Sequence, residues 1–140
     1  MSVELEFVDT NVLVYAHDHS AGEKRAAAAA LIDRLLDERG GCLSVQVLTE
    51  LAVTLTRKLP YPLSPEETAE IVGDFATWTV FAPGAGDVLD AIALSRRYQI
   101  SLWDALILHA AGSLGSRVLW SEDLSHGQRY GEVEVRNPFV

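Results

Sequence analysis

Short apolar runs that alternate with longer helical patterns are the feature that most restricts the fold of this chain. The runs predict buried strands at residues 5–8, 42–45, 78–81, 117–120 and 133–135. Strands that alternate with helices usually form a parallel sheet with helices on both faces. The sequence therefore predicts an α/β fold built around a parallel sheet.

Helical periodicity and end signals place the helices between these strands. We expect helices over residues 23–39, 46–59, 87–98 and 103–114, and a further helix that starts at Ser64. The first has an apolar stripe that includes Leu36, and Gly40-Gly41 should end it because glycine accepts the left-handed conformation cheaply. Ser64-Pro65-Glu66-Glu67 has the pattern of a capped helix start.

Length and composition narrow the class of protein. A chain of 140 residues suits one domain, which we expect to cover residues 1–140. The single cysteine, Cys42, excludes a disulfide within the chain and a zinc site built from cysteines, and it suits the reducing cytoplasm. The start of the chain lacks the pattern of a signal peptide, and no apolar run reaches the roughly 18 residues that span a bilayer. We therefore expect a cytoplasmic protein that does not associate with a membrane.

An aspartate directly follows the first predicted strand. Asp9-Thr10-Asn11 comes after the apolar run Leu5–Val8, and Asp123 occupies an equivalent place after residues 117–120. In an open parallel sheet the carboxyl ends of the strands face the ligand crevice. Several carboxylates gathered there would form the hard oxygen site that Mg²⁺ or Mn²⁺ prefers. Asp9 is also a suitable N-cap for a following helix, which is the plain structural interpretation.

Two more acids are weaker candidates on pattern alone. Asp104 opens a helix that is apolar on nearly all sides, and a charge there needs a partner or a metal, although Ser101–Asp104 also fits a capping box. Glu50 lies roughly 140° from the centre of the apolar stripe of its helix, which by itself predicts a solvated side chain. Asn11 and Ser121 either orient a carboxylate or serve as turn residues.

Other residue types give little support for a different kind of site. The four histidines show no spacing typical of a metal site, and no glycine-rich nucleotide-binding motif is present. The net charge of −9 argues against nucleic-acid binding through a broad basic surface. The few basic groupings, such as Arg57-Lys58 and Arg96-Arg97, mostly fit solvated helix faces, and one pair could flank a phosphate path.

The motifs taken together resemble a known family. They are Phe7-Val8-Asp9-Thr10-Asn11-Val12-Leu13, Glu50 after Ser44-Val45, Leu102-Trp103-Asp104-Ala105-Leu106-Ile107, and Trp120-Ser121-Glu122-Asp123-Leu124-Ser125-His126-Gly127-Gln128. In this order and spacing they resemble PIN-domain ribonucleases, and within them the VapC-type toxins of bacterial toxin–antitoxin pairs. The resemblance covers essentially the whole chain, and the sequence does not depart from it at the acidic positions.

The resemblance implies a fold, an activity and partners. It implies a three-layer α/β/α sandwich with a central, mostly parallel sheet, and a metal-dependent endoribonuclease that cleaves RNA with the help of Mg²⁺ or Mn²⁺. It implies that Asp9, Glu50, Asp104 and Asp123 form the acidic site, and that Asn11 and Ser121 occupy the auxiliary polar positions. On this basis Asp9 and Asp104 would be the principal metal ligands. A homodimer and a cognate antitoxin protein are the expected partners.

Three alternatives stay open at this point. A PIN nuclease that matures cellular RNA would have the same site without being a toxin. An acidic module without catalytic activity, which binds a basic partner, fits the negative charge. Phosphoryl transfer through an aspartyl phosphate at Asp9 is the third, but the haloacid-dehalogenase pattern requires a second aspartate where Asn11 stands.

Overall fold

A mostly parallel sheet forms the centre of the molecule. The structure is a computed structural model that describes residues 3–140. Within them, six strands form one sheet in the order β3-β2-β1-β4-β6-β5. The strands are β1 Glu6–Val8, β2 Gly41–Ser44, β3 Thr79–Phe81, β4 Val118–Trp120, β5 Arg129–Tyr130 and β6 Val133–Arg136. All neighbouring strands are parallel except β5, which pairs with β6 in the antiparallel direction. The predicted sheet is confirmed, although the short strand β5 was not predicted.

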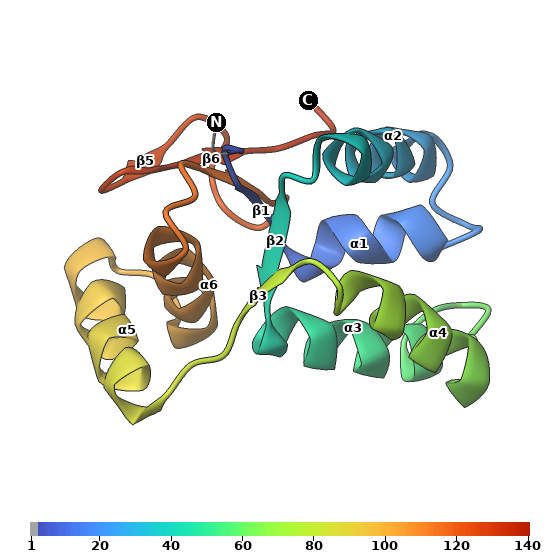
Figure 1. Ribbon diagram of the computed structural model, residues 1–140, viewed down its shortest axis with the longest axis horizontal. Coiled ribbons are helices and arrows are strands. Elements are labelled where there is room, and N and C mark those ends of the chain that lie inside the picture. Colours follow the sequence, from blue (N-terminus) through green and yellow to red (C-terminus); the bar gives the residue numbers. More distant parts are fainter. Residues whose placement is uncertain (1–2) are drawn as a thin grey trace.

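Helices cover both faces of this sheet. They are α1 Thr10–His17, α2 Glu23–Glu38, α3 Val45–Arg57, α4 Pro65–Phe75, α5 Ala85–Tyr98 and α6 Leu102–Ser113. Helices α5 and α6 lie on one side, and α1 to α4 lie on the other (Figure 1). Helix α6 contacts β2, β4 and β6, whereas α2 and α3 contact β2. The predicted three-layer sandwich is therefore confirmed. No helix among residues 3–140 is both long and apolar enough to cross a membrane.

The register of the central strands fixes the positions at which they end. Phe7 of β1 lies opposite Leu119 of β4, which in turn lies opposite Val135 of β6. All three side chains are fully buried, in one cluster with Ile107 and Leu108 of α6. A shift of one residue would turn these side chains to the other face of the sheet. Core packing therefore holds the carboxyl ends of β1 and β4 side by side.

The end of α2 differs from the prediction. Arg39, and not a glycine, adopts the left-handed conformation there, with φ 56°. Gly41 is needed for a different reason, because an added Cβ would lie 2.4 Å from ring atoms of Trp78. Leu36, which was expected in the apolar stripe, is 59% exposed. Sequence periodicity located the helix but did not resolve the edge of its buried face.

Candidate functional site

Asp9 lies where β1 ends and α1 begins, and both of its carboxylate oxygens accept hydrogen bonds. Its backbone N–H donates to the carbonyl of Trp120 in β4, at 2.9 Å. Oδ1 accepts from the amide of Thr10 at 2.7 Å, so the aspartate does cap α1. Oδ2 accepts from the hydroxyl of Ser121 at 2.8 Å. Capping therefore uses one oxygen, and the other faces the segment that follows β4.

Asp9 is buried without a positive partner, and this changes its protonation. Only 5% of the residue is exposed. The pKa of Asp9 is raised to about 7, chiefly by burial and also by the negative charges of Asp123 and Glu50, while the hydrogen bonds from Ser121 and Thr10 act against the rise. An ionised Asp9 is thus costly in the protein alone, and a bound cation would relieve that cost.

Asn11 and Ser121 connect α1 to the segment that carries Asp123. Ser121 is fully buried, and its hydroxyl accepts from the amide of Asp123 at 3.1 Å. The side-chain amide of Asn11 lies 3.4 Å from Asp9 Oδ2 and 3.5 Å from Ser121 Oγ. Its carbonyl oxygen accepts from the amide of Glu122 at 3.2 Å. Both auxiliary residues therefore orient the acids, and neither acts only as a turn residue.

Glu50 is the acid that the helical pattern placed incorrectly. The pattern of its helix predicted a solvated glutamate, but the residue is half-buried. Its Oε2 accepts from the hydroxyl of Thr10 at 3.0 Å, and its Oε1 accepts from the side chain of Gln46 at 3.1 Å. Thr10 therefore links Glu50 on α3 to Asp9, since its amide and its hydroxyl each donate to one of the two acids.

Asp104 lies in the first turn of α6 and forms half of the predicted capping box. Its amide donates to the hydroxyl of Ser101 at 3.1 Å. The return bond from the Ser101 amide to the carboxylate is not formed in the described chain. Burial raises the pKa of Asp104, with Asp123 and Glu50 acting in the same direction and the Ser101 hydroxyl against them. The Asp104 carboxylate is therefore not used in the cap.

The four predicted acids gather at one edge of the sheet, but they do not form a tight cluster. Asp123 and Glu50 each raise the pKa of both Asp9 and Asp104, so these two acids lie within electrostatic reach of the other two. Glu50 and Asp123 also line a pocket of about 490 Å³ between α1 and α3. Within residues 3–140, however, no three of these acids place ligand oxygens within 4.8 Å of one another.

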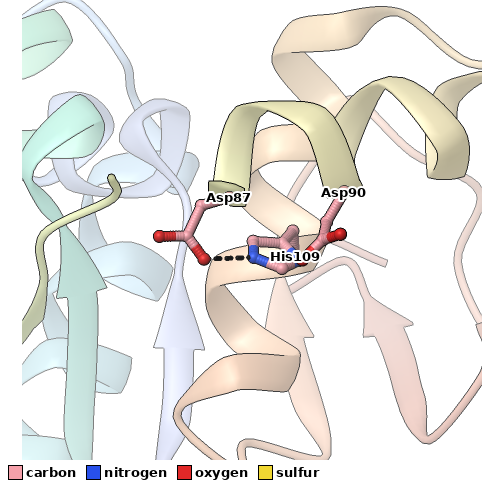
Figure 2. A group of neighbouring side chains, drawn as sticks. All are labelled: Asp87, Asp90 and His109. Carbon is pink, nitrogen blue, oxygen red and sulfur yellow. Dashed lines mark hydrogen bonds and ion pairs between the residues drawn. The ribbon is translucent and has the colours of Figure 1, made fainter. Parts of the chain in front are cut away.

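A different trio in the described part of the chain does meet that distance. Asp87 and Asp90 on α5 and His109 on α6 each offer a ligand atom within 4.8 Å of the others (Figure 2). Hydrogen bonds account for much of this arrangement. Asp87 accepts from His109 Nε2 at 2.8 Å and from the amide of Gly84 at 2.7 Å. The His109 side chain and then the Gly84 amide lower the pKa of Asp87, so this acid already has partners.

A polar clamp that the sequence did not reveal holds the segment between β4 and Asp123. Tyr15 donates its hydroxyl to Glu122 at 2.6 Å, and Lys24 forms an ion pair with the same carboxylate. The ammonium of Lys24 lies 4.9 Å from the centre of the Tyr15 ring. Phe139 packs edge-on against Tyr15, with the ring centres 5.0 Å apart. These residues are far apart in the chain, so no local pattern could have identified them.

Comparisons with known proteins agree with the fold and the motifs. A family model described as the PIN domain matches residues 7–130. Among curated proteins, no sequence matches the chain. Similar solved structures include a toxin–antitoxin complex from Klebsiella pneumoniae, with 17% identity and a TM-score of 0.69 over 95% of this chain and 97% of that one.

Two further structures are similar over most of their length. The DNA-bound VapBC complex from Salmonella typhimurium shares 20% identity, with a TM-score of 0.65 over 96% of this chain and 98% of that one. VapC20 from Mycobacterium tuberculosis, described as a toxin that cleaves the sarcin–ricin loop, shares 18% identity, with a TM-score of 0.63 over 84% of this chain and 88% of that one. At these identities the similarity shows the fold.

Proposed function

The chain belongs to the PIN-domain family, and from this premise we propose that it is a divalent-metal-dependent endoribonuclease, the toxin of a type II toxin–antitoxin pair. We propose one nuclease domain over the whole chain. The observation that carries the proposal is Asp9, a buried carboxylate that has the negative charges of Asp123 and Glu50 nearby and no positive partner. Such a group is expensive to ionise unless a cation binds beside it.

The donor set fits Mg²⁺ or Mn²⁺. Asp9, Glu50, Asp104 and Asp123 offer carboxylate oxygens alone, which hard cations prefer over nitrogen or sulfur ligands. Mg²⁺ in particular keeps several of its own waters and usually takes only one or two protein carboxylates directly. Oxygens that lie further apart than 4.8 Å are compatible with such a site, because some of the acids would act through water. We assign Asp9 and Asp104 as the principal ligands.

The surrounding residues prepare the acids for this role. A bound cation would lower the pKa of the attacking water and stabilise the negative charge of the leaving oxygen. Ser121 and the Thr10 amide fix the two oxygens of Asp9, while Thr10 and Gln46 fix those of Glu50. One of the carboxylates would accept the proton of the water. Asn11 has no carboxylate with which to assist an aspartyl phosphate, and its side chain is already bonded to Asp9 and Glu122.

The pocket beside the acids would receive the RNA next to the cleaved bond. Val14 of α1 and Val53 of α3 line it, and its walls are mainly apolar. Lys58, at the end of α3, is the basic residue in its lining. Lys58 follows Glu50 by eight positions, or about 12 Å along a helix axis. The lysine would bind a phosphate of the strand whose cleaved bond lies at the acids.

The toxin assignment rests on the kind of protein that shares this fold. The similar structures from Klebsiella pneumoniae and Salmonella typhimurium are toxin–antitoxin complexes. We therefore propose a cognate antitoxin as partner, a homodimer as the working form and the cytoplasm as the location. Exposed apolar side chains on α5 and at the start of α6, among them Leu89 and Trp103, offer surface for a protein partner.

Cleavage by the purified protein tests this function. Wild-type protein should cleave single-stranded RNA, EDTA should stop the reaction, and added Mn²⁺ should restore it. Asp9→Asn should keep the fold, judged by circular dichroism, and lose cleavage. Induced expression of the wild type, but not of Asp9→Asn, should arrest growth unless the antitoxin is expressed with it. Cleavage that persists in EDTA, or in Asp9→Asn purified free of other nucleases, would contradict the proposal.

A further inference from the structure

The sheet has a second recess whose charge differs from that of the whole chain. It has a volume of about 870 Å³, and its charged lining residues are Glu4, Glu6, Arg34, Arg117, Arg129, Glu134 and Arg136. The chain has 11 basic residues against 20 acidic ones, yet basic residues outnumber acidic ones in this lining. We call these residues, together with Trp120, the arginine hollow. It is the part of the sheet best suited to an anionic partner.

Two of the acids in the hollow are already neutralised. Arg34 of α2 donates two hydrogen bonds to Glu6, at 2.8 and 3.0 Å. The indole N–H of Trp120 donates to the same carboxylate at 2.8 Å, and these partners hold the pKa of Glu6 below its usual value despite burial. Arg136 donates two hydrogen bonds to Glu134, at 3.0 and 3.2 Å. These pairs hold the floor of the hollow together.

Two arginines in the hollow have no such partner. Across residues 3–140, Arg117 and Arg129 form no ion pair and no side-chain hydrogen bond, and both are exposed. Glu4 is the remaining acid of the lining against these two arginines, while Arg34 is also paired with Glu38, which lies outside the lining. A guanidinium group matches two oxygens of a phosphate and loses its water readily, which makes arginine the preferred contact for nucleic-acid backbones.

An aromatic ring lies among these charges. The guanidinium carbon of Arg136 lies 6.0 Å from the centre of the Trp120 ring. A sheet face that combines arginines with an aromatic side chain is a common surface for single-stranded nucleic acid. Arginine and tryptophan are also common at protein interfaces, so the RNA-binding measurement separates RNA from an acidic protein partner.

The hollow is separated from the acids along the sheet. Arg117 comes just before β4 and Ser121 just after it, so the two are about 13 Å apart along an extended strand. Arg129 lies on β5 at the far edge of the sheet, beyond β6 (Figure 1). An RNA that contacts both regions must therefore extend several nucleotides beyond the cleaved bond.

We propose that the arginine hollow binds backbone phosphates of single-stranded RNA outside the cleavage site, with Arg117 and Arg129 as the contacting residues. The proposal rests on the proposed ribonuclease function, and it explains how a chain of charge −9 retains a long polyanion. The hollow adds affinity for long RNA and leaves the cleavage chemistry unchanged.

Binding measured in EDTA tests the hollow separately from cleavage. The probes are a short single-stranded RNA that covers only the acids and a longer one, with fluorescence anisotropy recorded at several salt concentrations. For the long RNA, Arg117→Gln with Arg129→Gln should reduce the slope of log affinity against log salt by about 1.4, which is about 0.7 for each phosphate contact. Arg117→Gln alone should reduce it by about 0.7. Neither change should affect the short RNA.

Arg25→Gln with Arg96→Gln is the matched control. Both residues are exposed on helices outside the hollow, and the pair removes the same charge. An unchanged slope in the hollow variants, or an equal drop in the control, would overturn the proposal, and an unchanged slope is also the result expected if the hollow serves a protein partner. If the slope falls but the wild type cleaves no RNA with Mn²⁺, the ribonuclease function fails while the RNA-binding surface stands.

Discussion

The molecule has two groups of side chains that contain several acids, and the two groups differ in their surroundings. Asp87 on α5 accepts from His109 and from the Gly84 amide, and these partners lower its pKa. Asp9 at the sheet edge is buried near other acids, and its pKa is raised to about 7. The tighter of the two groups is therefore the one that already has its partners. Unsatisfied charge, and not short distance alone, is the reason that we propose a cation beside Asp9.

The largest difference between the two groups should appear in the pH dependence of stability. Asp9 has a pKa of about 7 in the folded protein, against about 3.9 when unfolded. Between these values the folded state binds more protons, so the stability of the metal-free protein should fall as the pH rises from about 4 to about 7. Asp9→Asn should remove this fall, and at pH 8 it should exceed the wild type in unfolding free energy by on the order of 4 kcal/mol.

Urea unfolding from pH 4 to pH 8, in the presence of EDTA, measures this effect. An Asp9→Asn variant less stable than the wild type at pH 8 would show that Asp9 is not strained in the folded protein. That result is expected if the ionised carboxylate of Asp9 has enough hydrogen bonds to stabilise its charge in the folded protein.

A smaller effect should follow from loss of the hydroxyl that orients Asp9. Ser121→Ala removes the bond to Asp9 Oδ2 and the acceptor of the Asp123 amide. Residues that orient ligands typically change metal affinity by about 10-fold to 100-fold, so Mn²⁺ should bind at least about tenfold more weakly. Ser125→Ala, in the same segment but exposed, is the control and should bind Mn²⁺ normally. Equal affinities in the two variants would remove Ser121 from the site.

The smallest effect should come from the Asp87 group, with the opposite dependence on pH. Because the folded pKa of Asp87 is lowered, its contribution to stability is present above the unfolded pKa of about 3.9 and is lost as the pH falls through the folded value. Asp87→Asn should therefore be slightly less stable than the wild type at neutral pH and equal to it in strong acid. Since the Asp87 side chain is only half-buried, the loss should be small. A variant that is more stable at neutral pH would contradict the stabilising hydrogen bond between Asp87 and His109.

Strand and helix order followed from the sequence because local patterns encode it. Asp9 was identifiable because strand ends in a parallel sheet face one edge, and this rule depends only on chain order. Glu50 was not, since its burial depends on Thr10, which lies 40 positions away and reaches it only in the folded chain. The family resemblance, and not the helical pattern, marked Glu50 as a candidate site residue.

Contacts between distant segments explain the other misses. Asp87 and His109 meet because α5 packs on α6, and neither helix alone predicts the pair. The arginines of the hollow are scattered from position 34 to position 136, so although Arg129 stood out as a basic residue, no local pattern joined it to the others. Such sites form only through tertiary packing, whereas helices and strands can be predicted mainly from the hydrophobic periodicity of the sequence.

Titration with Mn²⁺ tests the central claim most directly. Calorimetric binding would be measured at pH 8, where Asp9 is ionised, for the wild type, Asp9→Asn and Asp87→Asn. We predict that the wild type and Asp87→Asn bind Mn²⁺ equally well, and that Asp9→Asn binds at least about tenfold more weakly. Wild-type affinity in Asp9→Asn, with binding lost in Asp87→Asn, would place the cation at the other group and contradict the account.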